Sequence, residues 1–394
     1  MSIKLLDKHD NVAILLAGIF SIIISIGIAR FAFTSLLPSM LEEHLTLKEA
    51  GVLASFNFFG YLSGAIFSML IKDIYLKIIY LRLGIFLSII GTLLLATTSN
   101  ELLWLFARVI SGFGTALLFL IGSSLVMLKL NFKDKTKAMG IHFSGIGFAI
   151  LVSEVITQQV LKYGTWADAW MTLVFVALSL SLYVIYILSF DKSVKNEGVK
   201  YKFSTSIFSI YVILLILAYF TEGVGFVIQG TFLPDIINSL EGLDGYGNLA
   251  WLIVGLAGVP SSILWMRLAH RYGSVNMIIV AMLLQIVGII IPTLTNNIYI
   301  NLFSGALYGS TFIGLVALFM NRAGQLAKDN PVVLMGAMTS AYGIGQVLAP
   351  LYSVALISKY GNYNSTLFVT AFIVFMGVLL LILAKRFEPE KIII

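Results

Sequence analysis

The chain consists mostly of long apolar runs separated by short charged or turn-rich breaks. A helix that crosses about 30 Å of hydrocarbon needs about 20 mostly apolar residues. The runs are continuous, unlike the alternating segments of about ten residues that are typical of membrane β-barrels. We therefore predict twelve transmembrane helices, near residues 12–40, 46–71, 78–98, 101–129, 136–161, 166–190, 206–238, 247–270, 274–295, 298–321, 332–358 and 364–385.

The composition supports the same interpretation. Hydrophobic residues make up 59% of the chain and charged residues 11%, against roughly 45–50% and 25% in soluble proteins. The twelve spans leave no room for a soluble catalytic or nucleotide-binding domain. The chain has no cysteine, which excludes disulfides, thiolate metal sites and cysteine nucleophiles. We expect an all-α polytopic membrane protein without a cofactor or a metal site.

The distribution of lysine and arginine predicts the orientation, because cytoplasmic loops carry an excess of both. With both termini in the cytoplasm, 20 of the 25 lie in or next to cytoplasmic segments. Three lie in outer loops, and Arg30 and Arg108 lie within spans. We predict a multi-pass protein of the cell (inner or plasma) membrane with cytoplasmic termini. The net charge of +6 then follows from topology, and we expect no nucleic-acid partner.

Three short matches relate the two halves of the chain at nearly constant offsets of 196–198 residues. They join Ser-Leu-Leu-Pro at 35–38 to Thr-Phe-Leu-Pro at 231–234, residues 100–112 to 297–309, and Gly-Ile-Gly at 145–147 to 343–345. Repeated halves are common in transporter folds. We predict a six-helix half at 1–190, a cytoplasmic central loop at 191–204 and a second six-helix half at 205–394.

Several segments resemble motifs of the major facilitator superfamily. Residues 103–116 resemble its helix-4 motif, in which an arginine, here Arg108, is followed four residues later by Gly-x-Gly. Residues 268–273, Leu-Ala-His-Arg-Tyr-Gly, resemble its Leu-Ala-Asp-Arg-x-Gly loop. Residues 27–38 are similar to the helix-1 signature of the YbfB/YjiJ branch, which residues 142–147 and 343–346 also fit.

This resemblance covers essentially the whole chain. It implies two pseudo-symmetric six-helix bundles that transport a solute by alternating access, and it implies no enzyme activity. It also implies gating loops after spans 2 and 8, where Asp73, His270 and Arg271 occupy the motif positions. His270 stands where the superfamily usually has aspartate, and the loop around Asp73 lacks the usual glycine and spacing.

Four charged side chains lie within spans, where each one is costly unless it faces protein or water. Arg108 and Glu154 lie about 10–12 Å from the outer ends of their helices, and Arg30 and Glu222 about 18–20 Å, near the midplane. Arg108 and Glu154 are either a structural ion pair or a proton-linked switch. Arg30 either binds substrate or takes part in coupling. Alternatively, it is a buried structural residue that holds helices together. The fork of donors on Arg30 suits a carboxylate, sulfonate or phosphate.

Helix 1 lines the central cavity in proteins of the resembled family. Glu222, Phe226 and Gln229 share one helical face of span 7, and the repeat relates Phe226 and Gln229 to Arg30 and Phe33 of span 1. We expect Phe33, Phe226 and Gln229 to bind substrate with Arg30, and Glu222 to take up and release protons. Further candidates, equally suited to substrate contact and to interhelical hydrogen bonds, are Asn57, Tyr61, Tyr342 and Gln346.

These residues predict a proton-coupled symporter or antiporter of a small organic solute, anionic or zwitterionic. Its partners would be that solute, protons and the lipid bilayer, and we expect a monomer. A drug-type exporter of amphipathic compounds is the alternative, favoured by 13% aromatic residues and 13 methionines. An integral membrane enzyme is a remote alternative, because we find no ligand cluster or phosphate-binding loop in the sequence.

Overall fold

The computed structural model describes residues 7–71, 73–130, 135–189, 209–326 and 331–389. This part of the chain is almost entirely helical and contains no strand. It holds 12 helices that are long and apolar enough to cross a membrane. The predicted all-α fold with twelve spans is therefore confirmed. The predicted central loop at 191–204 lies outside the described residues.

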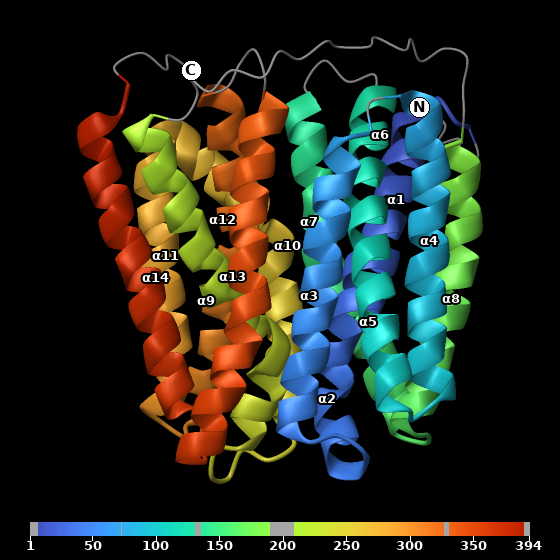
Figure 1. The fold of residues 1–394 in the computed structure, drawn as a ribbon, viewed down its shortest axis with the longest axis vertical. Helices are drawn as coiled ribbons and strands as arrows, with labels where there is room; N and C mark the ends of the chain where they lie inside the picture. The colour runs from blue at the N-terminus through green and yellow to red at the C-terminus, as the bar shows by residue number, and fades with distance from the viewer. Residues whose placement is uncertain (1–6, 72, 131–134, 190–208, 327–330, 390–394) are drawn as a thin grey trace. The chain divides into compact units, whose positions relative to one another are not determined.

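The helices form two compact units, and the first comprises Met1–His44 and Phe56–Val199. In Figure 1 most of its helices are coloured blue to green. Its elements are α1 (Asn11–Ile22), η1 (Ile23–Phe31), α2 (Ala32–Glu43), most of α3 (Leu47–Met69), α4 (Ile74–Thr97), α5 (Glu101–Ala116), η2 (Leu117–Ile121), α6 (Gly122–Lys129), α7 (Lys135–Leu161) and α8 (Trp166–Ile187).

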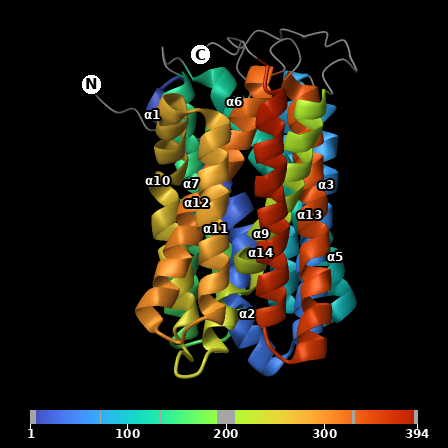
Figure 2. The same ribbon diagram turned by 90° about the vertical axis from the view of Figure 1, so that its left-hand side faces the viewer.

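The second unit comprises Leu45–Ser55, the start of α3, together with Lys200–Ile394. Grouping 45–55 with this unit differs from the division that the sequence repeat suggests. Its other elements are α9 (Ile210–Asn238), α10 (Gly247–Tyr272), α11 (Ser274–Ile290), η4 (Ile291–Thr293), α12 (Ile298–Leu326), α13 (Pro331–Tyr360), α14 (Asn364–Ala384) and η5 (Lys385–Phe387). Within it, α9 packs against α13 and α14, and α10 packs against α12 (Figure 2).

The first span is one continuous helical series of 33 residues, Asn11–Glu43. Asp10 caps its start, because its carboxylate accepts a hydrogen bond of 2.7 Å from the backbone N–H of Val12. Between α1 and α2, the nine residues of η1 form wider, π-helical turns. A second π-helical segment, η2, interrupts the fourth span. Neither segment was predicted from the sequence.

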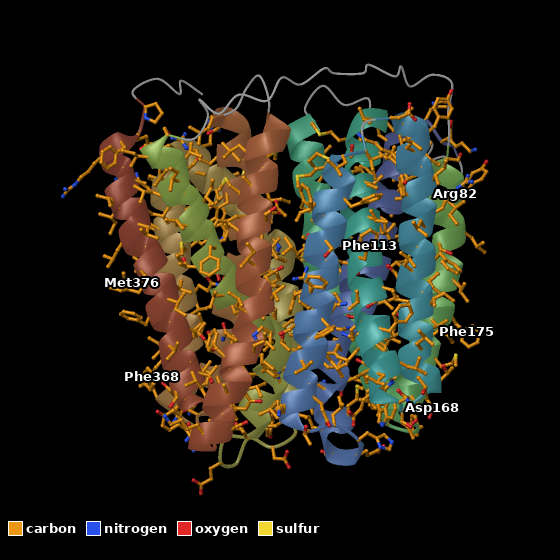
Figure 3. All side chains as sticks on the ribbon, in the orientation of Figure 1. Arg82, Phe113, Asp168, Phe175, Phe368 and Met376 are labelled. Carbon is orange, nitrogen blue, oxygen red and sulfur yellow. The ribbon has the colours of Figure 1, made fainter. Side chains whose placement is uncertain are left out.

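Apolar side chains cover the outside of both units. Phe175 on α8 is 62% exposed, and Phe368 and Met376 on α14 are 50% and 41% exposed. Figure 3 shows these three side chains on the outer faces of their helices. Apolar exposure on this scale is unusual for a protein surrounded by water. It is the surface expected of helices that contact lipid.

Candidate functional site

The π-helical segment η1 positions Arg30 inside the first unit. Side chains of α5 donate hydrogen bonds to two of its carbonyls: the Thr115 hydroxyl to Ser25 at 3.1 Å, and Nη1 of Arg108 to Ala29 at 3.4 Å. Gly27 allows η1 to approach α7, because an added Cβ would lie 2.7 Å from the carbonyl oxygen of Ala149. Single π-helical turns within α-helices occur frequently at functional sites.

Aromatic rings surround the guanidinium of Arg30, which is 6% exposed. Its central carbon lies 4.7 Å from the ring centroid of Phe58, 4.8 Å from that of Tyr61 and 5.4 Å from that of Phe31. The guanidinium also donates a hydrogen bond to the Tyr61 hydroxyl. The structure thus brings together two of the predicted substrate residues, Arg30 and Tyr61. The rings attract a cation through their faces.

Arg108 on α5 lies next to Arg30. Its side chain is buried, 2% exposed, and its guanidinium carbon lies 4.5 Å from the ring centroid of Phe33. Its Nη1 donates a hydrogen bond to the carbonyl of Ala29, the residue before Arg30. The two positively charged guanidinium groups are close enough to repel each other electrostatically. Phe33, predicted as a substrate residue, therefore belongs to the same cluster.

Glu154 is the third charged residue of the first unit's interior. It lies on α7, which packs against η1, and is 1% exposed. Among the described residues of this unit, Arg30, Arg108 and Glu154 are the buried Asp, Glu, Lys and Arg side chains. With Glu154 ionised, the three carry one net positive charge. The predicted pairing of Arg108 with Glu154 stays a prediction.

Asn57 fixes α3 against α5. Its Nδ2 donates 3.0 Å hydrogen bonds to the Arg108 carbonyl and to the Ser111 hydroxyl. The backbones are in close contact here, because a Cβ added to Gly112 would lie 2.0 Å from the Asn57 carbonyl oxygen. This arrangement favours the interhelical role for Asn57, one turn of α3 away from Tyr61.

Glu222 lies in the interior of the second unit and is fully buried. Its Oε1 accepts a 3.2 Å hydrogen bond from Nε2 of Gln285 on α11. Sequence reasoning missed Gln285, although an amide in the apolar stretch of α11 was a possible signal. Gln229, on the same face of α9, donates from Nε2 to the Gly288 carbonyl at 3.2 Å. The predicted substrate residue Gln229 thus binds the backbone of α11.

Phe226 and Tyr342, two predicted substrate residues, belong to one aromatic cluster. Their ring centroids are 5.9 Å apart, and Tyr342 stacks on Tyr219 at 4.5 Å. The Tyr308 hydroxyl donates a 2.7 Å hydrogen bond to the Phe226 carbonyl. Within the described part of the unit, the cluster members are Tyr219, Phe226, Tyr308, Phe312, Phe319 and Tyr342.

Gln346 lies one turn beyond Tyr342 on α13 and is fully buried. Neither atom of its amide has a hydrogen-bond partner among the described residues. Here α13 contacts α9 backbone to backbone, because a Cβ added to Gly345 would lie 2.5 Å from the Phe220 carbonyl oxygen. A buried polar group of this kind needs an explanation, and it keeps Gln346 a candidate for substrate binding.

The predicted gating residues lie at the ends of helices. Asp73 caps α4 and accepts hydrogen bonds from the N–H groups of Tyr75 and Leu76. His270 and Arg271 are exposed in the last turn of α10, just before Gly273 at φ +89°. In the described part of the chain, no group of three or more His, Asp or Glu side chains is placed to hold a metal ion.

Sequence reasoning also missed a buried arginine on α12. Arg322 forms an ion pair with Glu388, and its Nε donates a 2.8 Å hydrogen bond to the Tyr211 hydroxyl. These contacts tie the segment after η5 to the start of α9. The partners of Arg322 lie 111 and 66 residues away along the chain, so only the packing of helices reveals them.

In each unit, a side-chain hydrogen bond joins the end of the first span to the start of the last span. In the first unit, Nε1 of Trp166 donates a 2.9 Å hydrogen bond to Glu43. In the second, the Tyr363 hydroxyl donates to Asp235. Burial raises the pKa of the Tyr363 hydroxyl well above its ordinary value, and the Asp235 carboxylate raises that pKa further. Tyr363 therefore remains a hydrogen-bond donor at neutral pH.

Known proteins resemble the chain in sequence and in fold. Over 146 residues it is 25% identical to the multidrug efflux pump SdrM of Staphylococcus aureus (strain N315), a match that covers 36% of this chain. The match spans only 32% of that pump's length. The crystal structure of the nucleoside transporter NupG (D323A mutant) has the same fold, with a TM-score of 0.71 and 12% identity. That likeness covers 94% of this chain and 99% of the other.

Residues 22–382 match the model of one protein family, described as the uncharacterised MFS-type transporter YbfB, where MFS denotes the major facilitator superfamily. The matched segment includes all the spans except the first turns of span 1 and the end of span 12. The resemblance inferred from the helix-1 and helix-4 motifs is thereby confirmed. This chain belongs to the YbfB family of MFS-type transporters.

Proposed function

We propose that this chain is a proton-coupled secondary active transporter of a small organic anion or zwitterion. It is a monomer of the cell membrane with both termini in the cytoplasm. Its two six-helix halves move so that a midplane site opens alternately to the two sides of the membrane, as in other transporters built from repeated halves. Membership of an MFS-type transporter family supports transport itself.

The net positive charge buried in the first unit is the observation that favours an anionic substrate. Arg30 and Arg108 contribute two positive charges and Glu154 one negative charge, all at 6% exposure or less. An excess charge in a membrane interior is costly, and a bound anion would compensate it. The rings of Phe58 and Tyr61 lie against the Arg30 guanidinium. Its N–H groups, which lie in the guanidinium plane, suit a planar carboxylate.

Glu222 is the residue we propose as the proton carrier. It is the one buried Asp or Glu among the described residues of the second unit. Arg30 belongs to the first unit and Glu222 to the second, so substrate charge and coupling proton would be carried by different units. Glu154 and Arg108 could contribute to coupling in the first unit.

Binding to purified protein tests the substrate class. Carboxylates, sulfonates, phosphomonoesters and amino acids would be screened by thermal unfolding, with tetraphenylphosphonium as a cationic probe. A ligand that binds only the folded protein raises its melting temperature. We expect an anion or zwitterion to raise the Tm of the wild type but not of Arg30→Lys, with the exposed Arg82→Lys as control. A response to tetraphenylphosphonium alone would contradict the proposal.

A drug-type exporter is the second candidate, and the partial similarity to a multidrug efflux pump favours it. The rings of the cluster around Phe226, all buried at 7% exposure or less, are of the type that contacts such compounds. Ethidium efflux from cells that express the chain tests this candidate. Efflux that is unchanged in Arg30→Lys would support it over the anion transporter, and absence of efflux would exclude ethidium-type substrates.

A further inference from the structure

Glu222 and Gln285 form a buried, hydrogen-bonded pair inside the second unit, and each has one side-chain oxygen without a hydrogen bond from the described residues. Both residues are fully buried, and the bond between Nε2 of Gln285 and Oε1 of Glu222 holds them together at 3.2 Å. Among the described residues, no hydrogen bond reaches Oε2 of Glu222 or Oε1 of Gln285. Gly225, on the same helix as Glu222, allows close packing against Val374 of α14, because a Cβ added there would lie 2.3 Å from the Val374 side chain.

A third buried acceptor, Oε1 of Gln229, lies two helical turns further along α9. Gly288 is one helical turn from Gln285, and its carbonyl accepts hydrogen bonds from Gln229 and from the Ser304 hydroxyl. Oε1 of Gln229 is also buried without a hydrogen bond from the described residues. Buried acceptors are normally satisfied by a donor or an ion. Three of them on two contacting helices, α9 and α11, indicate a binding site for a species that oxygen atoms coordinate.

The surroundings of Glu222 provide no protein cation in the described part of the unit. Neither α11 nor α14 contains a Lys, Arg or His residue. Arg322 on α12 is bound to Tyr211, which lies three helical turns before Glu222 on α9. The basic residues of α10 and α13 lie in the last two turns of those helices: Arg267, His270, Arg271 and Lys359.

We propose that Glu222 and Gln285 form a binding site for a sodium ion. An all-oxygen ligand set suits a hard cation, and the single carboxylate balances one positive charge rather than two. Rotation of the Gln285 amide about its last bond would present Oε1 to the ion in place of Nε2, without movement of either helix. Gln229 presents a further oxygen two helical turns along the same face of α9, and the proposed site does not require it.

This inference rests on the proposed function, because it assigns a second coupling cation to the carboxylate proposed as the proton carrier. Sodium at Glu222 would take the place of the proton. Sodium binding is measured on purified protein without a substrate or a pH gradient. Failure of the sodium site would therefore leave proton coupling intact, and the reverse also holds.

Thermal unfolding in detergent at one fixed pH tests the site, with NaCl compared against KCl and choline chloride at equal ionic strength. We expect a saturable rise in Tm with sodium alone, since an ion that binds the folded state stabilises it. The near-isosteric Glu222→Gln should lose this rise. In Gln285→Met, the sodium concentration at half-maximal shift should increase about threefold or more, as for loss of one polar ligand.

Gln346→Met is the matched control, because Gln346 is also a fully buried amide of the second unit without a hydrogen bond from the described residues. It should keep the sodium response of the wild type. Equal responses to sodium and potassium, a full response in Glu222→Gln, or an unchanged half-maximal concentration in Gln285→Met would each overturn the proposal. Binding of radioactive sodium to the same variants provides a second measurement that does not depend on stability.

Discussion

Arg30 and Arg108 illustrate how a membrane protein retains two neighbouring guanidinium groups in its interior. Each lies within 5 Å of an aromatic ring centroid, on Phe58 and Tyr61 for Arg30 and on Phe33 for Arg108. The electron-rich faces of the rings offset part of the cost of removing the cations from water. Lysine would not reproduce this arrangement, because its ammonium is a point charge without a planar fork of donors.

At the residue scale, we predict that Arg108 and Glu154 interact. Glu154→Gln should destabilise the protein by about 3–5 kcal/mol, or less where water reaches the site, because it leaves a buried charge uncompensated. Arg108→Met introduced into that variant should restore part of the loss. Unfolding free energies of the two single variants and the double variant measure the coupling. Strictly additive effects would show that the residues do not interact.

The sequence identified the charged residues deep within the spans of both units, but neither their partners nor the buried Arg322. A charged side chain in an apolar run stands out because the membrane makes it costly. Gln285 carries no charge and was overlooked, although it binds Glu222 from 63 residues away. The donation from Asn57 to the backbone of Arg108 was foreseen only as one of two alternatives. Such contacts depend on which helices are neighbours, and residue spacing within one helix does not determine that.

Among the elements, η1 has the most direct link to the candidate site. Its wide turns carry Arg30, and donors from α5 reach its carbonyls at Ser25 and Ala29. Hydrophobic periodicity could not reveal it, because eight residues of Ile23–Phe31 are apolar or small and give no polar face to follow. The α-helical and π-helical alternatives therefore predict the same pattern over so short a stretch.

Thr115→Val tests the contribution of α5 to η1. The substitution removes the 3.1 Å bond from the Thr115 hydroxyl to the Ser25 carbonyl and should cost about 1 kcal/mol. Thr92→Val is the control: that hydroxyl is also buried, but it bonds Ser88 of its own helix, a contact that contributes little stability. Thermal unfolding of the two variants should show a larger loss for Thr115→Val. Equal losses would mean that the bond between α5 and η1 contributes nothing specific.

For the whole molecule, the sequence predicted the number and type of helices because each span must supply about 20 apolar residues. Each unit also has one side-chain contact between the end of its first span and the start of its last span. Trp166 at the start of α8 binds Glu43 at the end of α2, and Tyr363 before α14 binds Asp235 near the end of α9. The two contacts involve different residue types, so a comparison of the repeated sequences could not match them.

The orientation in the membrane is a prediction at this scale. If the lysine and arginine distribution sets it, a cysteine at Arg386 is labelled by an impermeant reagent only from the cytoplasm. A cysteine at Glu241 is labelled only from outside. Both positions are exposed, and the absence of native cysteine removes background labelling. Labelling of both sites from the same side would contradict a model with twelve spans between cytoplasmic termini.

Proton flux coupled to solute transport tests the central claim most directly. Purified wild type and Glu222→Gln would be reconstituted into vesicles that contain a pH-sensitive dye. The solute added would be the anion or zwitterion that raises the wild-type Tm. We predict that this solute changes the internal pH in wild-type vesicles, while Glu222→Gln binds the solute without a pH change. Equal pH changes in both, or no pH change with the wild type during uptake, would contradict proton coupling through Glu222.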